Sequence, residues 1–307
     1  MTRLNTVSPE NKNGLLSAIE NAELIIIGAG KEFSETSGVS YDDPAAFDTL
    51  FPNYYERYGL RTVNEALSFH FASMEERYAF LARFIYALRY KYPAGKPYRD
   101  LRRLIGNKPY FALTTNTDSQ FYKSGFAASK ICSYNGDYMY FQCASLREDD
   151  IFYNEFMIKK MIQNIAPDEF AVRPEYIPRC PRCGSVLLPN VRDKGAFISR
   201  PWLEKYRDHI DLINSYNGKN KLLLELGTDM DSLGIIRYPF EQLTTLRKNT
   251  NLIRINRRID HLKLYDNAEN IKTIQADIGE LLGELVTSSE FENNYLSEEN
   301  IPRLNCA

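Results

Sequence analysis

The chain of 307 residues is long enough to bury a full hydrophobic core, and its length suits one large domain or two unequal ones. Its 44% hydrophobic and 25% charged residues are ordinary for a soluble globular protein, and its net charge of −2 excludes the strongly basic proteins that bind nucleic acids or anionic membranes. A polar N-terminus, the lack of a membrane-length apolar run and an odd count of 5 cysteines predict a reduced, cytoplasmic protein without nucleic-acid or membrane partners.

The first predicted strand, Leu24–Ile27, follows a short helix over residues 11–21 and runs directly into the turn Gly28-Ala29-Gly30. Open α/β sheets build phosphate cradles in this way, because glycine lets a pyrophosphate approach the backbone amides. Phe33 stands where the dinucleotide fingerprint has its third glycine. Since many strands end in glycine, this turn alone leaves a nucleotide site and an ordinary turn both open.

A helical block follows the glycine turn. Residues 31–43 are polar and rich in turn formers, which predicts a long loop over a ligand, a mobile lid or a solvated connection. Residues 48–58 predict a helix or a turn. Between Thr62 and Tyr92 the apolar residues recur every three or four positions. This spacing predicts one sustained helix that ends at Pro93.

The strand pattern then returns and alternates with helices. Strands are predicted over residues 110–114, 131–133, 222–226 and 252–255, and helices over residues 202–216, 240–248 and 278–286. The stretch 137–192 breaks the alternation, since it carries a charged helix predicted over 150–164 and several cysteines. We interpret this stretch as an inserted module.

The alternation predicts an α/β fold with a Rossmann-like, doubly wound parallel sheet, whose ligands bind at the carboxyl ends of the strands. The Rossmann-like NAD-binding domain is expected to comprise residues 1–44, 106–136 and 193–307. The two interruptions, 45–105 and 137–192, are expected to fold together as a smaller domain with a helical part and a remnant zinc-ribbon part.

Polar residues and glycines follow four of the predicted strands: Gly28-Ala29-Gly30, Asn116 with Asp118, Gly227-Thr228, and Asn256. Each group taken alone is explained by a cap or a turn, where Asn, Asp and Gly are common. Because the carboxyl ends of parallel strands meet at one edge of the sheet, the groups together predict a polar crevice suited to a dinucleotide.

In order and spacing these strand ends resemble the sirtuin (Sir2) family of NAD-dependent enzymes. The family's Gly-Ala-Gly turn and its Ser-x-x-Ser-Gly loop match Gly28–Gly30 and Ser34–Gly38, with two extra residues between them. Its Thr-x-Asn-x-Asp, Gly-Thr-Ser and Asp-Ile-Gly motifs match Thr114–Asp118, Gly227–Asp229 and Asp277–Gly279. The resemblance covers most of the chain.

The resemblance implies NAD as the co-substrate and a set of residues that bind it: Gly28, Ala29, Gly30, Phe33, Ser34, Thr36, Ser37, Tyr41, Thr115, Asn116, Asp118, Gly227, Thr228, Asp229, Asn256, Arg257, Asp277 and Ile278. It also implies catalytic roles for three residues. Asn116 would orient a ribose hydroxyl or a water, Asp118 would hold the nicotinamide amide or order the loop, and Asn135 would position ribose hydroxyls.

The chain departs from the deacylating sirtuins at their His-Gly step, where Asn135-Gly136 stands. An amide has no proton that titrates near neutral pH, so Asn135 cannot act as the general base that deacylation needs. The three histidines, His70, His209 and His261, fall outside the motifs and are interpreted as surface residues. This combination is similar to the macrodomain-linked class M sirtuins, which are protein ADP-ribosyltransferases.

Membership of class M implies partners that composition does not show. The acceptor would be a lipoylated carrier protein of the glycine-cleavage H type, and a macrodomain ADP-ribosyl hydrolase would be a functional partner. The leading hypothesis is therefore protein mono-ADP-ribosylation. Three alternatives stay open: an NAD hydrolase, a deacylase with an unusual base, and a nucleotide-sensing module without turnover.

Three of the cysteines are candidate ligands of a structural zinc. Sirtuins commonly hold zinc with two Cys-x-x-Cys pairs, and Cys180-Pro-Arg-Cys183 is a good second pair. The first pair is broken, because Leu146 stands where the partner of Cys143 is expected. Cys143, Cys180 and Cys183 therefore leave two alternatives open: a zinc site whose missing ligand is an oxygen of Glu148 or Asp149, or a site that has lost its metal.

Overall fold

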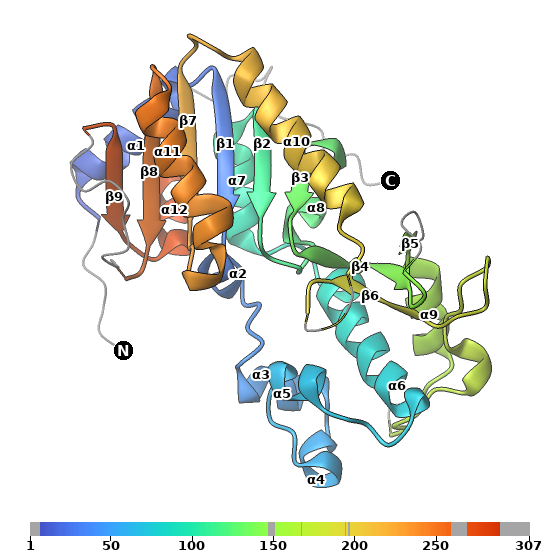
Figure 1. The fold of residues 1–307 in the computed structure, drawn as a ribbon. Helices are drawn as coiled ribbons and strands as arrows, with labels where there is room; N and C mark the ends of the chain where they lie inside the picture. The colour runs from blue at the N-terminus through green and yellow to red at the C-terminus, as the bar shows by residue number, and fades with distance from the viewer. Residues whose placement is uncertain are drawn as a thin grey trace.

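The computed structural model describes residues 7–146, 151–166, 168–193, 195, 197–258 and 269–288. The chain forms two parts, which Figure 1 shows one above the other. The larger part is built on a six-stranded sheet, and the smaller part combines short helices with a three-stranded sheet. Within the described ranges no helix combines the length and the apolar character that crossing a membrane requires.

The large sheet is parallel throughout, and its strands run in the order β3-β2-β1-β7-β8-β9. Its strands are Leu24–Ala29 (β1), Tyr110–Thr114 (β2), Ile131–Ser133 (β3), Lys221–Leu226 (β7), Thr250–Asn256 (β8) and Ile271–Gln275 (β9). The strand order reverses between β1 and β7, which is where doubly wound sheets bind their ligands. The predicted fold class is confirmed.

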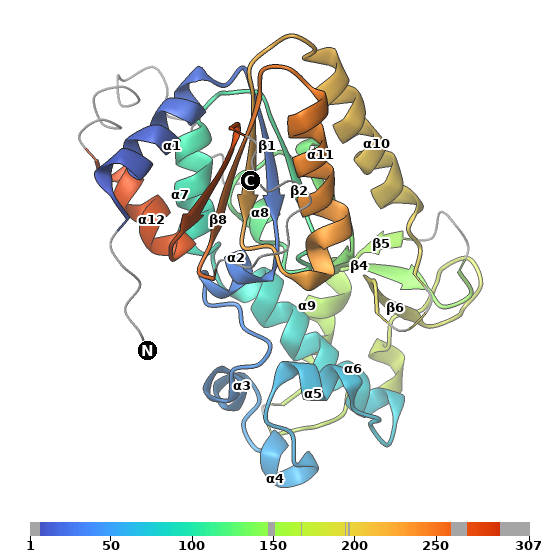
Figure 2. The same ribbon diagram turned by 60° about the vertical axis from the view of Figure 1, so that its left-hand side comes forward.

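Helices cover both faces of the sheet, as the turned view in Figure 2 shows. One face carries Pro9–Asn21 (α1), Lys96–Ile105 (α7) and Ile278–Val286 (α12), and the other carries Arg200–Ser215 (α10) and Tyr238–Leu246 (α11). All residues of β1, β2 and β7 are buried. Burial on both faces explains their nearly continuous apolar sequences, since a parallel sheet has no solvated face.

Helix α7 corrects the predicted domain boundary. We assigned residues 45–105 to the small domain, but Tyr98, Leu101 and Leu104 of α7 pack in the core of the large sheet. A strongly amphipathic helix must bury its apolar face, and the turn through Pro93 and Gly95 frees α7 to do so against the sheet. The helical contribution to the small part therefore ends before Lys96.

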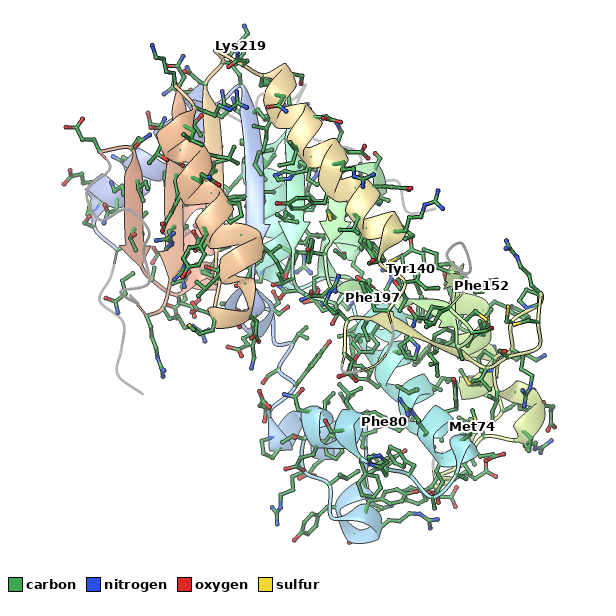
Figure 3. All side chains as sticks on the ribbon, in the orientation of Figure 1. Met74, Phe80, Tyr140, Phe152, Phe197 and Lys219 are labelled. Carbon is green, nitrogen blue, oxygen red and sulfur yellow. The ribbon has the colours of Figure 1, made fainter. Side chains whose placement is uncertain are left out.

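The small part has its own aromatic-rich core. Its elements are Pro44–Leu50 (α3), Tyr54–Tyr58 (α4), Val63–Ser68 (α5), Met74–Ile85 (α6), Gly136–Cys143 (β4), Ile151–Tyr153 (β5), Glu155–Gln163 (α9) and Leu187–Val191 (β6). The strands form an antiparallel sheet in the order β5-β4-β6. Phe80 lies inside this part, with ring centroids 5.1 Å from Phe51 and 5.9 Å from Phe84 (Figure 3).

The single helix predicted between Thr62 and Tyr92 is interrupted. Helix α5 ends at Ser68, α6 begins at Met74, and residues 86–91 continue as a π-helical turn (η1, Tyr86–Lys91). The hydroxyls of Thr62 and Ser73 each accept a hydrogen bond from the amide three residues on, at 3.1 and 3.2 Å. Each is followed by a glutamate at that position, which is the sequence signal of a helix start.

Two further expectations were wrong in detail. The predicted loop 31–43 begins with a helical turn, Lys31–Glu35 (α2), because the chain enters a helix directly from the glycine turn. The predicted helix 150–164 is split into strand β5 and helix α9, since Ile151–Tyr153 pairs with β4. Strands β4, β6 and β9 were not predicted, and neither was the short helix Gln120–Lys123 (α8).

His209 contradicts its interpretation as a surface residue. It lies in α10, is 1% exposed and packs between Phe111 and Tyr206. Within the described chain neither ring nitrogen has a hydrogen-bond partner of normal geometry. Exposed His70 lies in the connection between α5 and α6 rather than on a helix, and His261 falls outside the described residues.

Replacing His209 by leucine is expected to make the free energy of unfolding less dependent on pH. Burial lowers the pKa of His209 from 6.5 to about 4. Between these two pH values the unfolded chain therefore binds a proton at His209 and the folded chain does not. The buried His209 does not lower the free energy of unfolding above pH 6.5, but it lowers it progressively as the pH falls toward 4. Between about pH 7 and pH 4.5 the wild type should lose about 2 kcal/mol more than His209→Leu in urea unfolding. An equal loss in both proteins contradicts this assignment.

Candidate active site

The carboxyl ends of the central strands open into a cavity of about 290 Å³, whose lining includes Asn64 of α5 in the small part. It is lined by Lys31, Ser34, Val39, Tyr41, Asn64, Thr115, Asn116, Thr117, Asp118, Asn135, Asp229 and Asp231. All three residues predicted to be catalytic lie on this lining: Asn116, Asp118 and Asn135. Residues 31–41 follow β1 and residues 115–118 follow its neighbour β2, so the sheet topology brings the two segments together.

The glycine turn is held against the end of β7. The amide of Gly30 donates to the Leu226 carbonyl at 2.9 Å. A Cβ on Gly30 would lie 2.6 Å from the carbonyl oxygen of Gly227, which leaves no room for any side chain. Gly28 serves another purpose, since a Cβ there would strike Ile236 and Phe240 of the helical segment that covers β1. Gly30 therefore shapes the cradle, whereas Gly28 permits close helix packing.

Asn116 is anchored to the glycine turn. Its Nδ2 donates to the Gly30 carbonyl at 2.8 Å and lies 3.3 Å from the Tyr98 hydroxyl. Its own backbone amide donates to the Thr114 hydroxyl at 3.0 Å, and that hydroxyl donates to the Ala29 carbonyl. The amide group is thus fixed while the half-buried side chain still faces the cavity. The sequence did not reveal the contribution of Tyr98.

Asp118 is a buried carboxyl group at the cavity wall, 3% exposed. It accepts a short hydrogen bond from the Ser34 hydroxyl and another from the Gln120 amide at 3.0 Å. Burial raises the pKa of Asp118 above its ordinary value, although these hydrogen bonds oppose the rise. Asp118 joins the α2 segment to the loop after β2, as the motif comparison led us to expect of a loop-ordering residue.

Asn135 lies at the turn between β3 and β4. Its Nδ2 donates to the Thr115 carbonyl at 3.2 Å, and the residue is half-buried at the cavity. The histidines of the described chain, His70 and His209, are absent from the lining. Within the described residues, the cavity therefore has no imidazole to serve as a general base.

Thr228 and Asn256 lie at the ends of β7 and β8. Asn256 donates through Nδ2 to the Thr228 carbonyl at 2.8 Å. Its Oδ1 is buried and has no hydrogen-bond partner within the described chain, although the residue is only 4% exposed. A buried acceptor without a donor is costly, so this atom would suit a hydroxyl donor from a ligand, although Asn256 is not among the residues that line the cavity.

A buried ion network, which the sequence did not reveal, holds the Thr228 hydroxyl by hydrogen bonds. Glu225 Oε1 accepts from Arg237 Nε at 2.9 Å, lies 2.8 Å from Arg254 Nε, and also accepts from the Thr228 hydroxyl. Arg237 Nη2 donates to the Thr228 hydroxyl at 2.9 Å, and Arg254 pairs with Glu241 at 2.7 Å. The alternating charges lie in separate elements, so only the fold makes their pairing visible.

The remaining predicted cofactor residues divide into surface and core positions. Arg257 pairs with Asp277 at 2.7 Å, and the Arg257 amide donates to Glu32 at 2.7 Å. Asp277 also caps α12 by accepting from the Glu280 amide. The side chains of Ala29, Phe33 and Ile278 are buried in the core, and the hydroxyls of Thr36 and Ser37 donate to the Phe33 carbonyl. Five of these residues, Ala29, Phe33, Ile278, Thr36 and Ser37, therefore support the glycine turn rather than line the cavity.

The three predicted metal ligands come together in the small part. The sulfur atoms of Cys143, Cys180 and Cys183 all lie within 4.8 Å of one another. Tetrahedral zinc places its sulfur ligands about 3.8 Å apart, so the cluster is compatible with zinc. The Ser145 hydroxyl lies 2.9 Å from Cys143 Sγ and 3.2 Å from Cys183 Sγ. Hydrogen bonds from Ser145 and Ser185 lower the pKa of Cys183 to about 6, which favours the thiolate that binds metals.

The fourth-ligand candidates differ from expectation. Leu146, at the position where the sequence suggested a missing ligand, is 43% exposed and has a left-handed backbone. Glu148 and Asp149 lie outside the described residues. Ser145, which the sequence did not suggest, places a hydroxyl oxygen beside two of the thiols, and Ser185 places a second one beside Cys183.

No protein-family model matches this chain. The chain is 26% identical over 289 residues to a protein ADP-ribosyltransferase of Staphylococcus aureus, covering 94% of this chain and 89% of that protein. It is 24% identical over 275 residues to a probable bifunctional ADP-ribose hydrolase/ADP-ribosyltransferase of Fusarium oxysporum f. sp. cubense, covering 85% of this chain and 45% of that protein.

Solved Sir2 structures share the fold at low sequence identity. Sir2Tm bound to a propionylated peptide gives a TM-score of 0.56 at 16% identity, covering 91% of this chain and 98% of that one. A Sir2 homolog–NAD complex gives a TM-score of 0.55 at 16% identity, covering 89% of this chain and 92% of that one.

Fold and cavity together define an α/β protein of Sir2 architecture with a polar cleft at the sheet's switch point. The chain therefore has the fold of the Sir2 structures, as the resemblance drawn from its motifs led us to expect. The comparisons support the expected enzyme class, an NAD-dependent ADP-ribosyltransferase of that family.

Proposed function

We propose that this protein transfers a single ADP-ribose from NAD to a protein acceptor and releases nicotinamide. One observation carries the proposal: Asn116 and Asp118 are held in the cavity, while Asn135 stands where deacylating sirtuins have their histidine base. Among the described residues, the cavity that suits a dinucleotide thus has no histidine to act as the base that deacylation requires. The relationship to two ADP-ribosyltransferases supports the proposal.

The proposed reaction needs little from the protein beyond placement. The bond between nicotinamide and the ribose breaks with its electron pair going to nicotinamide, and the acceptor forms a bond to the same ribose carbon and loses a proton. Asn116, fixed by Gly30, would orient a hydroxyl or the nucleophile beside that carbon. The Asp118 carboxyl would stabilise the positive charge that develops on the ribose when it is ionised.

The acceptor that the resemblance implies is a lipoylated carrier protein of the glycine-cleavage H type, and we extend the proposal to it. A macrodomain hydrolase that removes the modification is the second proposed partner. The Fusarium relative supports this pairing, because its name joins an ADP-ribose hydrolase to an ADP-ribosyltransferase in one longer protein.

Intact-protein mass spectrometry tests the acceptor. The purified enzyme, NAD and a lipoylated carrier should give a mass gain of one ADP-ribose on the carrier. The matched control is the same carrier without its lipoyl group, which should gain little mass. Equal modification of both forms would remove lipoylation from the proposal, and modification of neither form would remove this acceptor.

We also propose that the cluster of Cys143, Cys180 and Cys183 holds a structural zinc, with Ser145 at the open side. Metal analysis should find about one zinc per chain, and Cys180→Ser should lose it. Cys132→Ser is the matched control, because Cys132 is buried in β3 outside the cluster. Ser145→Cys should slow metal removal by a chelator, and a faster removal contradicts the placement of Ser145.

A further inference from the structure

The turn between β3 and β4 holds the loop after β2 from one side. Asn135 Nδ2 donates to the Thr115 carbonyl, and the Tyr138 amide donates to the Thr117 carbonyl, both at 3.2 Å. A third connection joins Asp137 to Ser119. The loop between these contacts carries Asn116 and Asp118, so its shape depends on a segment that lies elsewhere in the sequence.

Asp137 provides the strongest of these connections. It is 1% exposed and accepts three hydrogen bonds: from the Ser119 amide at 3.1 Å, from the Met139 amide at 2.8 Å, and a short one from the Ser119 hydroxyl. Both of its oxygens are therefore used within the protein. Asp137 is absent from the cavity lining, so its contribution to the site passes through Ser119.

Ser119 needs this support because its backbone is left-handed, with a φ of 59°. This backbone conformation raises the free energy of residues with a Cβ, and serine is no exception. Two hydrogen bonds from one buried carboxylate to the same residue offset that cost. Since Ser119 directly follows Asp118, its conformation sets the direction in which Asp118 meets Ser34.

We propose that Asp137 is a positioning residue that fixes Ser119, and through it Asp118 and Asn116, in the geometry that the transfer reaction uses. This inference rests on the proposed function. It adds Asp137, a second buried carboxylate besides Asp118, to the residues on which the transfer reaction depends. The carboxylate acts without touching NAD or the acceptor, by keeping the loop after β2 in one conformation.

The charges around Asp137 fix the conditions of the test. Asp118 faces it from the loop after β2, and Arg89 faces it from the η1 segment. Burial, with a smaller contribution from Asp118, raises the pKa of Asp137 to about 7, whereas its hydrogen bonds and Arg89 oppose the rise. Assays at about pH 8 keep most of the carboxyl ionised, the form that accepts all three hydrogen bonds.

The first test compares Asp137→Asn with Asp100→Asn. Asp100 is a matched control, because it is also buried, at 4% exposure, but pairs with Lys96 on α7. We expect Asp137→Asn to lower kcat for nicotinamide release by about 10- to 100-fold and to change the Kd for NAD by less than about threefold. Asp100→Asn should keep both values. An unchanged kcat in Asp137→Asn overturns the proposal.

A second variant separates positioning from simple damage to the fold. Adding Ser119→Gly to Asp137→Asn should recover at least about fivefold in kcat, because glycine enters the left-handed region without penalty. If Asp137→Asn is inactive and the glycine restores nothing, Asp137 is a structural residue and the proposal fails.

Hydrogen exchange gives a readout that does not depend on the reaction. The amides of Ser119 and Gln120 should exchange at least about tenfold faster in Asp137→Asn than in the wild type, and at the wild-type rate in Asp100→Asn. This result would stand even if the wild type released no nicotinamide, which would contradict the proposed function alone. Unchanged exchange at these amides would contradict the inference itself.

Discussion

Replacing Asn116 by alanine is expected to lower the rate of nicotinamide release by about 10²- to 10⁴-fold while the affinity for NAD changes by less than about threefold. The amide of Asn116 is held by the Gly30 carbonyl and Tyr98, and the residue lines the cavity beside Asp118. Alanine removes this oriented group but leaves the Gly30 cradle and the buried acceptor of Asn256 in place. The loss should therefore fall on kcat.

Single-turnover nicotinamide release and calorimetric titration with NAD measure the two quantities separately. Asn64→Ala is the matched control, because Asn64 lines the same cavity from α5 and its Nδ2 bonds to exposed Asp42. Its rate should stay within about threefold of the wild type. If Asn116→Ala retained a tenth or more of the wild-type rate, the catalytic role given to Asn116 would be wrong.

Replacing Glu225 by glutamine is expected to lower the free energy of unfolding by about 3 kcal/mol. Glutamine keeps the shape of the side chain but leaves Arg237, which is 0% exposed, and Arg254, which is 3% exposed, without their shared carboxylate. Arg254 retains Glu241, so Arg237 bears most of the loss. The neutral amide oxygen is also a weaker acceptor for the Thr228 hydroxyl than the carboxylate, so the affinity for NAD should weaken together with stability.

Urea unfolding tests this expectation against an exposed ion pair. Glu155→Gln breaks the pair with Lys159 on α9 and should change the free energy of unfolding by less than about 0.5 kcal/mol. A loss of less than about 1 kcal/mol in Glu225→Gln would show that the buried network does not stabilise the end of β7.

The sequence predicted the sheet and its functional edge well, because short continuous stretches of sequence indicate both. Leu24–Ile27 and Leu222–Leu224 are continuous apolar runs, and runs of this kind belong to strands buried on both faces. The residues that follow them are polar or glycine, and a parallel sheet brings all such residues to one edge. Asn116 and Asp118 could therefore be placed at this edge from the strand pattern, whereas Asn135 was assigned through the resemblance to the sirtuin motifs.

What could not be predicted depends on contacts between distant segments. Asp137 looked like an ordinary residue after a turn, yet it binds Ser119, and the partners Ser34 and Asp118 are 84 residues apart. The register of a strand is not needed to predict its end, but the pairing of Glu225 with Arg254 on the neighbouring strand requires it. Helix α7 was misassigned for the same reason, since its amphipathic pattern does not say which core it joins.

The most direct test of the account follows the ADP-ribose moiety of labelled NAD into its products. The purified protein would be incubated with a lipoylated carrier and an acyl-lysine peptide together, and the label on protein, in free ADP-ribose and in acyl-ADP-ribose would be measured. We predict that most of the label appears on the carrier and that release of free ADP-ribose without an acceptor is slow. Label found mainly in acyl-ADP-ribose, or in free ADP-ribose regardless of acceptor, would contradict the proposed transfer.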